Sequence, residues 1–306
     1  MFWRYRRFFH VSLQLLLEHR GKDISRVFRG ESTASHVHSE AAHRLLAEYC
    51  VGRLDDKRGT INEDHSQQSE LPRHPKAHKP SNCIDSSKPV IPQLSKLTPS
   101  EYKEWVYSPV PGQPRFFRSA LLESATKVRW WVVPLVWIPL VILSMSKALA
   151  TGLSGLSVLF FIVMGLVAWQ LMEYSLHRFV FHSNPNTPTQ IILHFLLHGC
   201  HHKYPMDIDR LVFPPVPASL VVGAVFSLLQ WSIPRPPALA IFAGMLGGYV
   251  CYDCIHYFIH SGCLGGSLKV AHMKHHFVSP ASGFGISSPL FDLIFSTNMY
   301  KSVHKM

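Results

Sequence analysis

The chain has 306 residues, of which 47% are hydrophobic and 16% are charged, and its formal net charge is +11. Charged residues are sparse after residue 129, so this part of the chain is too apolar to form the surface of an ordinary soluble protein. The sequence has no zinc-finger spacing and no aromatic-basic pattern, so its positive charge does not indicate a nucleic-acid-binding protein. Six scattered cysteines in a chain of this length argue against a disulfide framework.

The first 93 residues fall into two segments. Leu45, Leu46 and Tyr49 recur at helical spacing, so we expect a small helical segment within residues 10–58. Residues 59–93 are rich in Pro, Ser, Lys and His without a periodic apolar pattern, which predicts a flexible linker. We expect the remainder, residues 94–306, to form a membrane domain.

Four apolar runs in this domain are predicted to cross a membrane as helices: residues 130–149, 153–172, 216–231 and 237–252. Very short connections within each pair predict two hairpins, and the fold is expected to be all-α and multi-pass. The two shorter runs could instead be re-entrant, which would leave the flanking segments on the same side. Lys and Arg concentrate in the long stretches 173–215 and 253–306, so the positive-inside rule places both stretches in the cytoplasm.

Histidine spacing is the strongest signal in the sequence. Eleven of the 20 histidines lie between residues 177 and 276, and ten of these form the patterns H-x4-H, H-x2-H-H, H-x3-H and H-x2-H-H. The ten are His177, His182, His198, His201, His202, His256, His260, His272, His275 and His276. Residues three or four apart share a helix face, so three patterns can present their imidazoles together. His177 and His182 are five apart and need either a helix end or a π-type bulge to converge.

Ten imidazoles are too many for one ion, so the sequence predicts two ions on one membrane face. Either five histidines bind each ion, or one histidine stands outside the ligand set. Neutral imidazole suits iron, zinc, copper and nickel. Glu173, Asp253, Asp207 and Asp209 lie near these patterns and are candidates to accept hydrogen bonds that orient the ligands. His194 belongs to no pattern, and we expect it to be structural.

The type of chemistry follows from the donor set and its place beside the membrane. The H-E-x-x-H motif of many zinc hydrolases is absent. Attack on an unactivated C–H bond of a lipid chain requires a cofactor, because side-chain acids and bases cannot perform it. We therefore expect a membrane oxygenase with a cytoplasmic helical cap that carries two metals, and no catalytic side chains beyond the metal ligands.

Six strings of residues support a resemblance to a known family: EYSLHRFVFH (173–182), LHFLLHGCHH (193–202), RLVFPPVPAS (210–219), YDCIHYFIH (252–260), AHMKHHF (271–277) and SGFGIS (282–287). They resemble the fatty acid 2-hydroxylase branch of the fatty acid hydroxylase and sterol desaturase superfamily, over about residues 100–300. The resemblance implies an endoplasmic-reticulum membrane enzyme. Its substrates would be long or very long fatty acyl or ceramide lipids of sphingolipid synthesis, hydroxylated at C2.

The same resemblance implies the cofactors. All ten histidine positions of the family are occupied, which implies two iron ions, although zinc could occupy the isolated protein. It also implies O2 as oxidant and electrons from NAD(P)H through a reductase and cytochrome b5.

Residues 15–54 resemble the second half of a cytochrome b5 domain. His38 stands where the second haem ligand is expected, but the H-P-G-G motif of the first ligand is absent. We therefore expect residues 1–58 to bind no haem and a separate cytochrome b5 to supply the electrons.

Two alternatives remain at this point. The first is a related reaction on the same scaffold, such as sterol desaturation or methyl oxidation. The second is a membrane metal-binding protein without catalysis, either a transporter or an inactive relative. Lipid product analysis separates the first from acyl hydroxylation, and metal uptake together with O2-dependent turnover separates the second.

Overall fold

The computed structural model describes residues 53–54, 61–62 and 84–299, and the chain divides into two compact units, Met1–Cys83 and Ile84–Met306. In the first unit, Arg53–Leu54 (β1) pairs antiparallel with Ile61–Asn62 (β2). His38 and the predicted helical segment before residue 53 lie outside the described residues. The second unit begins within the predicted linker, and Val90 is already fully buried in it.

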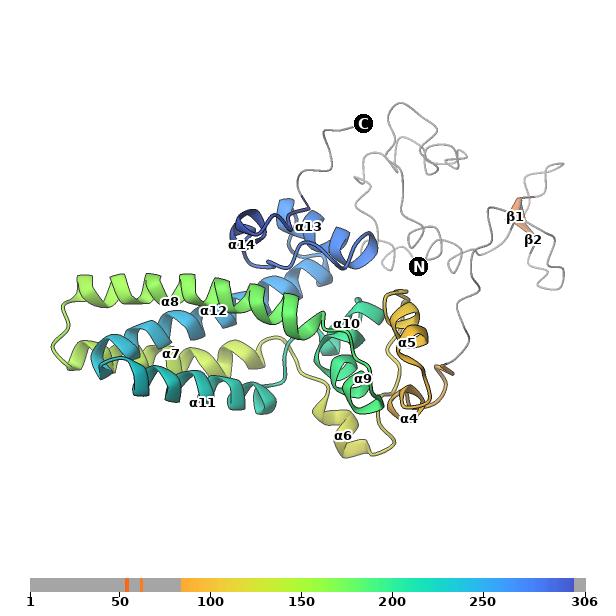
Figure 1. The fold of residues 1–306 in the computed structure, drawn as a ribbon, viewed down its shortest axis with the longest axis horizontal. Helices are drawn as coiled ribbons and strands as arrows, with labels where there is room; N and C mark the ends of the chain where they lie inside the picture. The colour runs from red at the N-terminus through yellow and green to blue at the C-terminus, as the bar shows by residue number, and fades with distance from the viewer. Residues whose placement is uncertain (1–52, 55–60, 63–83, 300–306) are drawn as a thin grey trace, which may run out of the picture. The chain divides into compact units, whose positions relative to one another are not determined.

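Four helices of the described residues are long and apolar enough to cross a membrane, as predicted. They are α7 (Val132–Ala150), α8 (Gly155–Ser175), α11 (Pro215–Ser232) and α12 (Arg235–Ser261). Figure 1 shows both hairpin connections, α7 to α8 and α11 to α12, at the same end of the bundle. Residues 84–299 contain no strand, which confirms the all-α fold for this unit.

Helix α12 is the inner helix of the bundle. Of its most apolar 18-residue window 72% is buried, against 17–22% for the corresponding windows of the other three helices. Small residues allow α8 to approach it closely: a Cβ added at Gly165 would lie 2.1 Å from the carbonyl oxygen of Ile241. Large apolar side chains of the outer helices, such as Leu159 and Leu220, are exposed, as expected for surfaces that face lipid.

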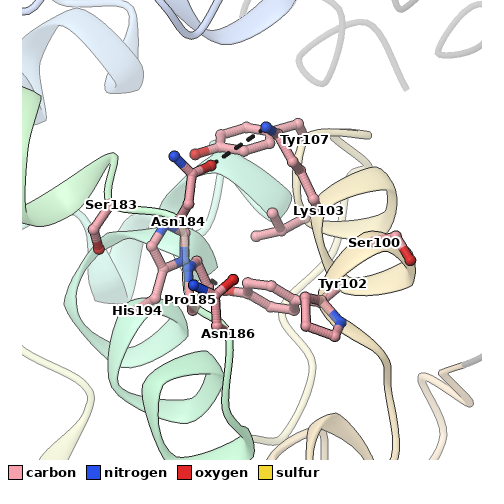
Figure 2. Close-up of a pocket in the computed structure, with 11 residues that line it drawn as sticks. Ser100, Tyr102, Lys103, Tyr107, Ser183, Asn184, Pro185, Asn186 and His194 are labelled. Atoms are coloured by element: carbon pink, nitrogen blue, oxygen red, sulfur yellow. Dashed lines mark hydrogen bonds between the residues drawn. The ribbon is translucent and has the colours of Figure 1, made fainter.

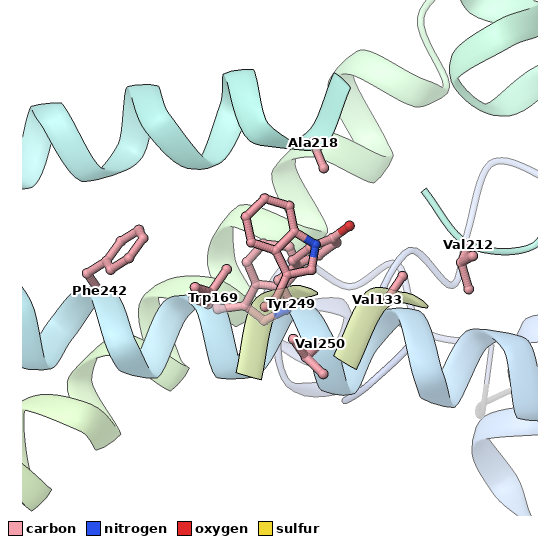
Figure 3. Close-up of a cluster of buried hydrophobic side chains, with 9 residues drawn as sticks. Val133, Trp169, Val212, Ala218, Phe242, Tyr249 and Val250 are labelled. Atoms are coloured by element: carbon pink, nitrogen blue, oxygen red, sulfur yellow. The ribbon is translucent and has the colours of Figure 1, made fainter. Parts of the chain in front are cut away.

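A cluster of buried apolar side chains lies where the four long helices meet. Trp169 of α8 and Tyr249 of α12 pack together there, with ring centroids 5.5 Å apart. Val133 of α7 and Ala218 of α11 complete the contact (Figure 3).

Short helices form a cap at the other end of the bundle (Figure 1). They are α4 (Ile91–Leu94), α5 (Pro99–Val106), α6 (Ala120–Ala125), α9 (Pro188–His194), α10 (Cys200–Lys203), the 3-10 turn η4 (Ile208–Arg210), α13 (Ser267–Phe277) and α14 (Leu290–Ile294). Two of them start with a capping box and a proline: Thr98 with Glu101 in α5, and Thr187 with Gln190 in α9. These local signals define where the cap helices begin.

Candidate metal centre

The ten predicted histidines converge into two groups of five in the cap. In each group, one nitrogen from every histidine lies within 4.8 Å of those of the other four. The first group is His177, His182, His198, His202 and His275, and the second is His201, His256, His260, His272 and His276. The structure therefore favours the five-plus-five arrangement over one with a histidine left out.

Each H-x2-H-H pattern contributes to both groups. On α10, His202 joins the first group and His201 joins the second. On α13, His275 joins the first group, and His276 joins the second. Neighbouring residues point about 100° apart around a helix, so an adjacent pair can reach two different ions. The doubled histidines thus link the two groups to each other.

A π-helical turn solves the spacing problem of the H-x4-H pattern. Residues Leu176–Phe181 (η2) continue α8 as a π-helix, and the amide of His182 donates to the carbonyl of His177 at 3.1 Å. An i to i+5 hydrogen bond places residues five apart one above the other. A second π-helical turn, Phe195–Gly199 (η3), carries His198 into the first group. The histidine spacing does not predict this second turn.

The spacing of the imidazole nitrogens fits metal ions. Neighbouring histidines in each group have Nε2 atoms 2.8–3.2 Å apart. Two ligand atoms at right angles around an ion, with bonds of about 2.0–2.1 Å, lie about 3 Å apart. The donor set therefore matches ions that accept nitrogen ligands, and it offers every ion five of them.

Backbone carbonyls orient three of the imidazoles. His177 Nδ1 donates to the carbonyl of Phe284 at 2.6 Å, and His256 Nδ1 donates to that of Leu211 at 2.9 Å. His275 Nδ1 donates to the carbonyl of Ser282 at 2.7 Å. With its proton on Nδ1, each ring keeps the lone pair of Nε2 free for an ion.

The four carboxylates proposed as orienting groups have other partners. Glu173 accepts from the backbone amides of Ile286 and Ser287, and Asp253 accepts from that of Phe213. Asp207 accepts from Arg210 at 2.5 Å, while Asp209 faces Arg129 at 3.8 Å. Glu173 and Asp253 thus hold loops next to histidines, and Asp207 and Asp209 form ion pairs.

Tyr107 is a functional candidate that the sequence did not single out. Its hydroxyl hydrogen-bonds Nδ1 of His182 at 3.2 Å, and its ring stacks on the same imidazole. His182 is the one member of the two groups that is only partly buried. Figure 2 shows Tyr107 beside a cavity of about 240 Å³, with Tyr102 and His194 also at its wall.

His194 has the structural role that was expected of it. Its Nδ1 hydrogen-bonds the hydroxyl of Tyr102 at 2.7 Å, and it belongs to neither histidine group. A Cβ at Gly199 would lie 2.6 Å from that hydroxyl, so the pair packs directly against the η3 turn.

Burial keeps the cap imidazoles neutral. It lowers the pKa of His198, His201 and His272 well below the ordinary value, and the neighbouring imidazoles lower it further. The pKa of His182 is lowered by the same two causes. Neutral imidazole is the form that binds metal, so the site is prepared to bind ions at neutral pH.

A larger cavity of about 550 Å³ joins the membrane-spanning helices to the histidines. Three histidines line it, His198 of the first group and His201 and His256 of the second. Its other walls are mostly apolar and include Trp169 and Met172 of α8, Val221 and Val225 of α11 and Met245 of α12.

Comparison with known proteins identifies the family. The fatty acid hydroxylase profile matches residues 162–297, which contain all ten histidines. The fatty acid 2-hydroxylase of Homo sapiens is 38% identical over 93% of this chain and 84% of its own length. The chain belongs to the fatty acid hydroxylase family. This confirms the resemblance of the histidine motifs and makes the chain an oxidoreductase of the hydroxylase class.

A plant relative and a solved structure each match about 70% of this chain. The dihydroceramide fatty acyl 2-hydroxylase FAH1 of Arabidopsis thaliana is 38% identical over 70% of this chain and 92% of its own length. A solved structure, full-length scs7p with only its hydroxylase domain visible, has a TM-score of 0.67 and 36% identity. The match covers 71% of this chain and 85% of the solved chain. The fold of this hydroxylase unit is therefore shared with a solved hydroxylase domain.

Proposed function

We propose that this protein hydroxylates C2 of long and very long fatty acyl groups that enter sphingolipids. The large cavity carries the proposal. Its apolar walls belong largely to membrane-spanning helices, and histidines from both groups also line it. An acyl chain could leave the bilayer, lie against these walls and present a carbon near its polar end to the metals.

The side chains that line the cavity favour an uncharged acyl group, such as an amide, over a free carboxylate. Arg210 is the only Lys or Arg among the described residues that line the cavity. Its guanidinium donates to both Asp207 and Glu123 at 2.5 Å, so its charge is already compensated. Apart from the bound ions, which the histidines already coordinate, no described residue on the cavity wall offers a free cation to an additional carboxylate. This agrees with the name of the plant relative, a dihydroceramide fatty acyl 2-hydroxylase.

The proposed reaction replaces one hydrogen on C2 by a hydroxyl group whose oxygen comes from O2. The second oxygen atom leaves as water, and two electrons and two protons balance the reaction. Two iron ions, held by the two histidine groups, would supply the oxidising chemistry when bound. The protein holds the ions, excludes water around the buried imidazoles and fixes which carbon of the chain lies beside them.

The remaining parts of the proposal concern electrons and location. We place the protein in the endoplasmic-reticulum membrane, as the family resemblance implies. The distribution of Lys and Arg favours a cytoplasmic position for its cap. Electrons would come from NAD(P)H through a reductase and a separate cytochrome b5, because the H-P-G-G haem motif is absent from this chain.

The proposal is tested by expressing the chain in cells that lack their own hydroxylase, under 18O2. Mass spectrometry of hydrolysed sphingolipids should show 2-hydroxy fatty acids that carry one labelled oxygen. The variant His201→Ala should give none, because it removes a ligand of the second group. Asp209→Asn is the control, since Asp209 forms only a surface ion pair, and it should keep wild-type product levels.

Three outcomes would count against the proposal. Unlabelled hydroxyl groups would exclude O2 as the oxygen source. Oxidised sterols in place of 2-hydroxy acids would favour the related reaction on the same scaffold. Metal-loaded protein without any product, in the presence of cytochrome b5 and its reductase, would indicate an inactive relative.

A further inference from the structure

The loop at residues 282–287 is held by a carboxylate that the sequence did not single out. Asp292, in α14, is 2% exposed. Its Oδ1 accepts from the amide of Phe284 at 2.9 Å, and its Oδ2 accepts from that of Gly285 at 2.6 Å. A Cβ at Gly285 would lie 2.9 Å from Oδ2, so the absence of a side chain allows the close approach.

A second buried carboxylate holds the next two amides of the same loop. Glu173, in α8, is 3% exposed. Its Oε1 accepts from the amides of Ile286 at 2.7 Å and Ser287 at 2.9 Å, and its Oε2 accepts from the hydroxyl of Ser287. Gln170, one turn earlier on α8, donates to that hydroxyl at 2.8 Å. Four successive amides are thus fixed by two carboxylates that are far apart in the sequence.

The loop in turn holds two imidazoles of the first histidine group. The carbonyl of Phe284 accepts from His177, and the carbonyl of Ser282 accepts from His275. Both histidines belong to the first group, and neither belongs to the second. The position of this loop therefore determines the orientation of two of the five nitrogens at one ion.

We propose that Asp292 and Glu173 are positioning residues that set the affinity of the first histidine group for its ion, through the loop at residues 282–287. The inference rests on the proposed metal-dependent function and names residues that control one of its two sites. The two carboxylates do not act as ligands, because the donors of the loop already occupy their oxygens. A buried carboxylate requires such donors, and together they fix the loop in one conformation.

The second group has a separate arrangement of the same kind. Asp253 of α12 accepts from the amide of Phe213, and the carbonyl of Leu211 accepts from His256. The bonds from Phe213 are long, at 3.3 and 3.4 Å. Since the two loops serve different groups, each carboxylate should affect one ion and leave the other unchanged.

The test measures Zn²⁺ affinity of the full-length chain in detergent, after removal of metal by a chelator. Two backgrounds isolate the groups: His260→Ala/His272→Ala leaves the first group complete, and His182→Ala/His198→Ala leaves the second complete. In the first background, Asp292→Asn should weaken Zn²⁺ binding about 10–100-fold, the usual effect of removing a partner that orients a ligand. In the second background, the same change should leave the affinity unchanged.

Matched variants complete the design. Asp253→Asn should show the reverse pattern and weaken only the second group. Asp209→Asn, the same change at a surface carboxylate, should alter neither affinity. If Asp292→Asn does not fold, Ser287→Ala removes one donor to Glu173 and keeps the backbone bonds, and it should weaken only the first group by a smaller factor.

Two results would overturn the inference alone, and one would overturn more. Unchanged affinity of the first group in Asp292→Asn would show that the loop does not control it. Equal weakening of both groups would show a general structural effect. A wild-type chain that binds no Zn²⁺ and no Fe²⁺ at either group would overturn the proposed function together with this inference.

Discussion

The two histidine groups contain five imidazoles each, but the chain builds them in different ways. The second group comes from regular turns of α10, α12 and α13, and all its members are buried. The first group draws two members from the π-helical turns η2 and η3 and includes His182, which follows η2 and is partly buried. Regular helices supply every member of the second group, whereas the first group depends on π-helical turns as well.

Removal of one imidazole from either group should have the largest effect. His182→Ala and His260→Ala should each bind one ion in place of two. Their activity should fall by more than about 10–100-fold, which is the usual effect of removing a partner that orients a ligand. Metal content per chain and 2-hydroxy product are the measurements. If either variant kept both ions and full turnover, its histidine would not be a ligand.

The contact between α8 and α12 should affect both groups together. Gly165→Ala places a Cβ 2.1 Å from the carbonyl oxygen of Ile241, so α8 must move away from α12. Overpacking of this kind costs about 1–3 kcal/mol. Because α8 leads to His177 and α12 carries His256, we expect lower thermal stability and weaker binding of both ions.

The control for this prediction is Gly223→Ala. Gly223 lies on α11, and a Cβ there meets nothing within 4 Å. This variant should melt at or slightly above the wild-type temperature, because alanine is the better helix former. Equal melting temperatures of Gly165→Ala and Gly223→Ala would show that the close contact at Gly165 does not contribute to stability.

Two tyrosines sharpen the comparison between a ligand and a structural histidine. Tyr107→Phe removes the hydroxyl that hydrogen-bonds His182, and we expect about 10-fold weaker binding of the first ion. Tyr102→Phe removes the same kind of bond from His194, which belongs to neither group, and should leave both affinities unchanged. The measurement is a metal titration of the two variants. Equal affinity of the first group in Tyr107→Phe and Tyr102→Phe would show that Tyr107 does not support metal binding.

The last effect comes from His194, which should change how stability depends on pH in acid and leave metal binding unchanged. Burial lowers the pKa of His194 from 6.5 to about 4. The unfolded chain therefore binds a proton below pH 6.5 that the folded chain does not bind until about pH 4. The stability from this residue is complete above pH 6.5 and is lost as the pH falls through this window, at about 1.4 kcal/mol per pH unit.

Chelator-treated His194→Gln is the matching variant. Its unfolding free energy should fall less steeply between pH 6.5 and pH 4 than that of the chelator-treated wild type. Near neutral pH the two proteins should differ by about 1 kcal/mol, the typical value of one hydrogen bond. Parallel pH profiles would show that His194 does not titrate in this range.

Much of the second group could be predicted from sequence alone. Its pairs His256 with His260 and His272 with His276 are four residues apart, and a regular helix places such residues on one face. The four spanning helices were also predictable, because continuous apolar runs of this length have few other uses. Local spacing and composition contain both signals.

Assignment of adjacent histidines to different ions could not be predicted. His275 and His276 differ by one position in the sequence, but which group each joins depends on where α10 and α12 lie around α13. The role of Asp292 was hidden for a similar reason. Its partners, Phe284 and Gly285, are close in sequence, but their importance depends on His177, more than 100 residues earlier.

The sequence by itself therefore determined the membrane helices, the ten histidines and the family to which they belong. These depend on residue type and local spacing, which a chain carries before it folds. Only the tertiary structure decided the division into two groups, the π-helical turns and the carboxylates that hold the loops. The two groups and the roles of the carboxylates depend on contacts between segments far apart in the chain, and neither composition nor periodicity records which distant segments will meet. The π-helical turns form by local hydrogen bonds, but the spacing of His177 and His182 was equally compatible with a helix end.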